Sequence, residues 1–119
     1  MKPLHLYITE AGNPISTSTL NKIYKGLMID DRERLQDILQ LTSAHNNLPS
    51  IQDIEDLFRK GTYQDRVDDY FEYVTNWLGS VGIKPEAVTS YFSLGHSGKN
   101  MKISVIAQVI HALISNYKF

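Results

Sequence analysis

Hydrophobic residues recur along most of this chain at intervals of three and four positions. That spacing places them on one face of an α-helix, which turns by about 100° per residue. It predicts helices that contain residues 20–24, 30–42, 50–58, 63–78, 85–92 and 101–117. The inner faces of the first five carry Leu20, Ile23, Tyr24, Leu35, Ile38, Leu39, Thr42, Ile51, Ile54, Leu57, Phe58, Val67, Tyr70, Phe71, Val74, Trp77, Leu78, Val88 and Phe92. The chain is therefore predicted to be mainly α-helical.

The first residues follow a different pattern. Residues 4–9 alternate apolar and polar side chains, which is typical of a β-strand, and residues 10–14 contain the Gly, Asn and Pro of a turn. Residues 15–19 would then pair back as a second strand or form the capped start of a helix. The spacing of Leu20, Ile23 and Tyr24 favours the helix, which Gly26 would end. We therefore expect one short N-terminal strand or hairpin before the helices.

Helix-capping residues support several of the predicted boundaries. Asp30 and Glu33 stand three positions apart, as in a capping box, where side-chain oxygens accept hydrogen bonds from free backbone amides. Ser50 and Thr62 are suited to cap the two helices that follow them. Pro85 fits a first helical position, where its missing N–H costs nothing.

The segment of residues 101–117 is apolar on almost every side. Its β-branched residues would suit a strand, but seventeen residues without a break predict a helix. No charged residue lies between Lys102 and Lys118, a pattern typical of a central helix surrounded by others. One polar stripe interrupts it, either a slightly exposed edge or a seam that faces a partner: Ser104, Gln108, His111 and Ser115.

Together these patterns predict one globular domain over residues 1–119. We expect a compact bundle of five to six helices around the hydrophobic C-terminal helix, because no repeat and no linker rich in Gly, Ser or Pro divides the chain. The composition, 42% hydrophobic and 21% charged, excludes global disorder. The chain has no cysteine, which excludes disulfides, thiol catalysis and cysteine metal sites.

The distribution of apolar residues indicates where in the cell the protein resides. No apolar run approaches the roughly 20 residues that cross a bilayer, and the first residues lack the apolar core of a secretory signal. We therefore expect a cytoplasmic protein with no membrane partner.

Residues 95–99 invite comparison with two glycine-containing motifs. A P-loop has four residues between its glycines, whereas two separate Gly95 from Gly98. A nucleophile elbow, G-x-S-x-G, also fails, because Gly98 comes one position early. The loop is interpreted as a connector between helices, with one alternative: a small anion bound by backbone amides near Gly98 and Asn100, where a helix begins.

The four histidines do not form a metal motif. His5, His45, His96 and His111 lack the i, i+4 spacing of a helical zinc pair, and no thiolate is present to assist them. The sequence therefore predicts no metal and no cofactor.

Charge is distributed unevenly, although the net charge is only −1. Residues 30–73 carry eleven acidic and five basic side chains, whereas both flanking segments are mildly basic. No segment has the dense Lys and Arg clustering of a typical phosphate-backbone interface.

The helix predicted over residues 63–78 concentrates this negative charge on one face. At 100° per residue, its carboxylates lie opposite its apolar stripe: Asp65, Asp68, Asp69 and Glu72. Tyr73 falls at the border, beside Arg66. Carboxylates that point at water are poorly placed for acid–base catalysis, which needs one of them to be desolvated. This face is either a solvated surface or a contact for a cationic partner.

Residues 18–26 resemble the recognition helix and following turn of some phage-type helix-turn-helix regulators. The resemblance rests on polar residues, Leu20, Ile23 and the terminal Lys25-Gly26. It implies DNA binding through Asn21, Lys22 and Lys25. A second helix-turn-helix would span residues 85–113, with Lys99 and Lys102 as its phosphate contacts, although its loop is long for that motif.

These observations lead to three hypotheses about function, of which an enzyme with a dispersed site ranks last. The first is a small non-enzymatic protein-binding module, of the kind found among immunity proteins, antitoxins and phage-encoded inhibitors, that covers a partner protein. Its contact residues would be Asp65, Asp68, Asp69, Glu72 and Tyr73, and the partner would be basic. The alternative is a small DNA-binding regulator. The sequence leaves open whether the protein also forms a homo-oligomer.

Overall fold

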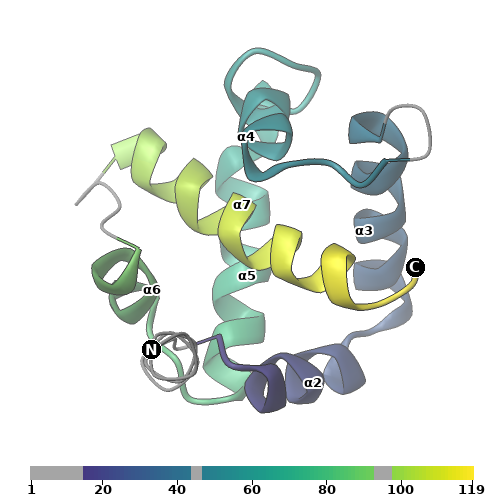
Figure 1. The fold of residues 1–119 in the computed structure, drawn as a ribbon. Coiled ribbons are helices and arrows are strands. Elements are labelled where there is room, and N and C mark those ends of the chain that lie inside the picture. The colour runs from purple at the N-terminus through teal and green to yellow at the C-terminus, as the bar shows by residue number, and fades with distance from the viewer. Residues whose placement is uncertain (1–14, 44–46, 93–97) are drawn as a thin grey trace, which may run out of the picture.

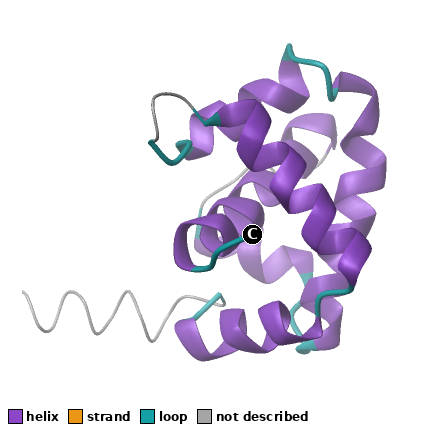
Figure 2. Ribbon diagram, turned by 90° about the vertical axis from the view of Figure 1, so that its right-hand side faces the viewer, coloured by secondary structure: helices purple, strands orange, loops and turns teal. Residues whose placement is uncertain are grey.

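The computed structural model describes residues 15–43, 47–92 and 98–119 of the chain. Its elements are α2 (Thr17–Gly26), α3 (Ile29–Thr42), α4 (Ile51–Arg59), the 3-10 turn η1 (Gln64–Arg66), α5 (Val67–Ser80), α6 (Pro85–Tyr91) and α7 (Gly98–Asn116). The described residues thus form a mainly helical, compact bundle, as predicted, and Figure 2 shows the short loops that join its helices. The predicted N-terminal strand or hairpin lies outside the described residues.

Helix α7 forms the centre of the bundle. It packs mainly against α5 and α4 and also contacts α2, α3 and α6. Figure 1 shows it crossing in front of α5, with the other helices arranged around the pair. Side chains on all its sides are buried, including Ile103, Val105, Ile106 and Val109, which confirms the prediction of a surrounded helix. The helix begins at Gly98, three residues earlier than predicted.

The polar stripe of α7 is less exposed at one end than the other. Ser104 is only 9% exposed, and its hydroxyl donates to the carboxylate of Glu55 on α4 at 3.4 Å. Gln108 and His111 are half-buried and Ser115 is exposed. The stripe therefore begins inside the bundle and reaches solvent only towards the end of α7.

The predicted helix caps have mixed outcomes. Ser50 caps α4 as expected, accepting from the backbone N–H of Asp53 at 3.1 Å, and Pro85 occupies the first turn of α6. The predicted pair Asp30 and Glu33 is wrong, because α3 begins at Ile29 and Asp31 therefore stands third. Its carboxylate accepts from the backbone N–H of Met28 at 3.4 Å.

The predicted cap at Thr62 is also wrong. The chain forms the 3-10 turn η1 before α5, and neither η1 nor α5 has a side-chain cap. The helix predicted over residues 63–78 is therefore α-helical only from Val67 onward.

None of the helices in the described part of the chain combines the length and hydropathy needed to cross a bilayer.

Candidate functional site

The candidate site is the outer face of η1 and α5, which carries the four predicted carboxylates. The opposite face of α5 is fixed in the core by Val67, Tyr70, Val74, Trp77 and Leu78, all of which are buried. Asp65, Asp68, Asp69 and Glu72 are all exposed, so the predicted orientation towards solvent is confirmed. The buried face of α5 therefore fixes the positions from which Asp68, Asp69 and Glu72 extend, and Asp65 extends from η1.

Asp68 differs from the other three carboxylates because it has a basic partner. The ammonium group of Lys102, on α7, donates to a carboxylate oxygen of Asp68 at 2.9 Å. This hydrogen bond and the charge of Lys102 lower the pKa of Asp68 below its ordinary value. Asp68 therefore remains ionised, and Lys102 offsets much of its negative charge.

This pair gives a direct prediction about titration. In Lys102→Ala we expect the pKa of Asp68 to rise towards the ordinary aspartate value, measured by NMR titration of its carboxyl carbon. Because the folded-state pKa is lowered, the pair stabilises the fold above the unfolded-state pKa, and that contribution is lost as the pH falls through the folded-state pKa. Lys84→Ala, an exposed lysine at the start of α6, is the control. An unchanged midpoint in Lys102→Ala would contradict the assignment.

The other three carboxylates have no basic partner like that of Asp68 among the described residues. Asp65, Asp69 and Glu72 form no ion pair with any described residue. Asp65 lies in η1 rather than in α5, so its direction follows the tighter 3-10 turn and not the 100° step assumed for it. The negative surface therefore consists of Asp65 at one end and of Asp69 with Glu72 along α5.

Tyr73 lies at the edge of this surface, in contact with a residue that sequence reasoning missed. Its ring is half-buried against Tyr70, edge-on at a centroid distance of 5.2 Å. The guanidinium of Arg34, on α3, lies 3.9 Å from the Tyr73 centroid, and Asp31 holds that guanidinium with a 2.7 Å ion pair. The expected neighbour Arg66 instead lies 5.8 Å from the ring of Tyr63. One face of Tyr73 is therefore covered by a cation–π contact.

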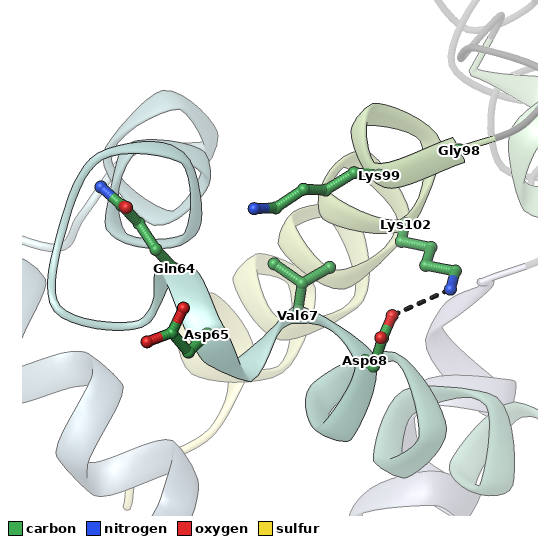
Figure 3. Close-up of a pocket in the computed structure, with 7 residues that line it drawn as sticks. All are labelled: Gln64, Asp65, Val67, Asp68, Gly98, Lys99 and Lys102. Atoms are coloured by element: carbon green, nitrogen blue, oxygen red, sulfur yellow. Dashed lines mark hydrogen bonds and ion pairs between the residues drawn. The ribbon is translucent and has the colours of Figure 1, made fainter.

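A surface hollow of about 320 Å³ lies where the start of α7 meets η1 and α5 (Figure 3). Lys99 extends from α7 over the hollow, and Lys102 turns to Asp68 (Figure 3). Asp65 and Asp68 line the same hollow, so an anion at the start of α7 would meet two carboxylates as well as two lysines. This mixture of charges gives little support to the alternative that an anion binds near Gly98. Residues 93–97, which precede Gly98, lie outside the described residues.

One pair of side chains on α7 resembles part of a catalytic arrangement. The hydroxyl of Ser115 and Nε2 of His111 are 3.3 Å apart, and burial lowers the pKa of His111. No carboxylate of the described residues forms a hydrogen bond with His111, so the group that orients the imidazole in a Ser-His-Asp triad is lacking there. Within residues 15–43, 47–92 and 98–119, no three His, Asp or Glu side chains are grouped to hold a metal ion.

The lysines of the DNA-binding alternative occupy two places. Lys22 and Lys25 are exposed on α2, whereas Lys99 and Lys102 lie on the first turns of α7. A recognition helix needs an exposed face to enter the major groove. From Ile103 to Ile110 every side chain of α7 except Gln108 is buried, so a helix-turn-helix at residues 85–113 would offer chiefly the first turns of α7.

Comparison of the chain with protein-family models, curated proteins and solved structures gives no significant match.

Proposed function

We propose that this protein is a non-enzymatic binding module that covers a basic surface of a partner protein with the acidic face of η1 and α5. The observation that carries the proposal is the exposure of Asp65, Asp69 and Glu72 without an ion pair to any described residue. Covering a partner in this way is how small immunity proteins, antitoxins and phage-encoded inhibitors act, and we place the protein among such blocking modules.

Two features make this face suitable for rapid association. The carboxylates carry the same sign and lie close together in sequence, Asp65 on η1 and the others on α5, so their fields add. Of these four carboxylates, only Asp68 forms an ion pair with Lys102, which offsets its charge. At the edge, Tyr73 and Arg34 form a flat amphipathic contact, and both residue types are enriched at protein interfaces.

The test is charge reversal on α5. The partner is first captured from native lysate with the wild-type protein at low salt, and binding kinetics are then measured with the purified pair. We expect Asp69→Lys with Glu72→Lys to slow association by about tenfold or more at low salt, because attraction between an acidic face and a basic partner raises on-rates by about 10–10³. Dissociation should change much less, and the difference should shrink at high salt as the charges are screened.

The matched control is Glu33→Lys with Asp37→Lys on α3. These two side chains are also exposed, and their reversal changes the net charge by the same amount. A purely global charge effect would slow both double variants equally. Equal association rates for the α5 variant and wild type would remove this face from the mechanism. A gel-shift assay at low salt tests the DNA-binding alternative. If the protein binds DNA, the α5 double variant should bind it as well as wild type or slightly more tightly.

A further inference from the structure

One ion pair connects the acidic face to the central helix. Lys102 reaches from α7 to Asp68 on α5, and its ammonium group donates to a carboxylate oxygen at 2.9 Å (Figure 3). Ile103, the next residue of α7, is only 1% exposed, so the backbone that carries Lys102 is fixed in the bundle. The chain alone therefore forms this pair, without a partner.

Both members of the pair remain accessible to water. The side chain of Asp68 is 85% exposed, and that of Lys102 is 35% exposed. An exposed ion pair stabilises a protein only weakly, because water solvates both ions when they separate. A cation on a partner can therefore reach Asp68 and replace Lys102 there without disturbing the fold.

A second lysine of α7 acts on the same end of the acidic face. Lys99 extends over the hollow that Asp65 and Asp68 line, and it forms no ion pair with any described residue (Figure 3). Its charge, like that of Lys102, lowers the pKa of Asp68. Asp69 and Glu72 lie outside the lining of this hollow. The negative charge of the face is therefore offset most towards α7 and least at Asp69 and Glu72.

We propose that Lys102 is an intramolecular competitor for the acidic face, which a strongly basic partner displaces from Asp68 when it binds. This inference rests on the proposed function, because it requires a partner at that face. Asp69 and Glu72 attract the partner first, since no lysine offsets them. A lysine or arginine of the partner then pairs with Asp68, and the ammonium group of Lys102 turns to solvent.

This competition favours one kind of partner. A partner with a single cation is satisfied by Asp69 and Glu72 and gains nothing from displacing Lys102. A partner with clustered basic side chains gains a further ion pair at Asp68. Lys102 thus weakens binding of isolated cations at this end of the face, and it acts as a specificity-determining residue.

The first test needs no natural partner. Tetralysine is titrated into the ¹³C-labelled protein at low salt, and NMR follows the carboxyl carbons of Asp68, Asp69 and Glu72. In wild type, Asp68 should respond only at higher peptide concentration than the other two. In Lys102→Met, which keeps an unbranched side chain without the charge, Asp68 should respond at about threefold less peptide than in wild type.

The matched control is Lys84→Met, which changes the net charge by the same amount. Lys84 is exposed at the start of α6, and its charge is not among those that lower the pKa of Asp68. This variant should leave the response of Asp68 as it is in wild type.

The second test uses the captured partner. Lys102→Met should lower the Kd by about threefold at low salt, and Lys84→Met should lower it less. In an Asp68→Asn background, Lys102→Met should give no more gain than Lys84→Met, because the carboxylate that it frees is gone. Such dependence of one substitution on the other is the mark of a direct pair.

The outcomes separate this inference from the proposed function. If Asp68 responds at the same tetralysine concentration in wild type and in Lys102→Met, the competition is refuted, whereas responses at Asp69 and Glu72 leave the proposed function standing. If none of the three carboxylates responds in either protein, both proposals fail. Equal gains in partner binding from Lys102→Met and Lys84→Met would reduce the effect to net charge and would also refute the competition.

Discussion

Trp77→Ala is expected to lower the free energy of unfolding by about 3–5 kcal/mol, the usual cost of truncating a large buried aromatic side chain. Trp77 is only 7% exposed and lies on the same stripe of α5 as Tyr70 and Val74, which are also buried. The loss combines the transfer of apolar surface with the cavity left behind. Urea unfolding followed by circular dichroism measures it.

The neighbouring position supplies the control. Asn76 is exposed on α5, so Asn76→Ala should change the stability by less than about 0.5 kcal/mol. If Trp77→Ala left the denaturant midpoint unchanged, the face of α5 assigned to the core would be wrong. The carboxylates on the opposite face would then not point to solvent.

Ile103→Asp and Val105→Asp should each destabilise the protein by more than about 4 kcal/mol, because each buries an unpaired charge. The two positions are 1% and 0% exposed. They lie about 200° apart around α7. Both substitutions therefore destabilise the protein only if other elements cover both sides of this helix. Since total stabilities of small domains are about 5–15 kcal/mol, we expect largely unfolded spectra by circular dichroism.

The control for this pair is Asn100→Asp, which adds the same charge at an exposed position in the first turn of α7. A carboxylate near a helix N-terminus is tolerated or mildly stabilising. A folded, stable Val105→Asp or Ile103→Asp variant would show that one side of α7 is open to water.

The helices and their inward faces were predictable because they depend on local periodicity. Leu20, Leu35, Ile54 and Val88 recur at helical spacing with their neighbours, and all four are buried as expected. The central place of α7 followed from the same logic, since no charge interrupts it between Lys102 and Lys118. Errors at the caps arose where a shift of one or two residues changes which side chain reaches a free amide, as at Asp31.

The contacts that modify the candidate site were not predictable from the sequence. Lys102 reaches Asp68 because α7 packs on α5, and the long side chain of Arg34 reaches Tyr73 from α3. No local pattern encodes those distances. The surface groove lined by Leu39, Leu48 and Phe119 likewise joins α3, residues before α4 and the end of the described chain. Spacing along one helix gives the direction of a carboxylate but not the side chain that another element brings to it.

The central position of α7 also bears on the order in which the protein acquires its structure. A ribosome makes α2, α3, α4, α5 and α6 before it makes the helix against which all of them pack. Until residues 98–116 emerge, the apolar faces of the earlier helices lack their common partner, and a nascent chain exposes them. The contact of Tyr24 with Tyr117 closes a long loop, and the chain can form it only after residue 117 has been made. Folding of the bundle should therefore wait for α7, and the waiting chain is the state most exposed to aggregation and chaperone capture.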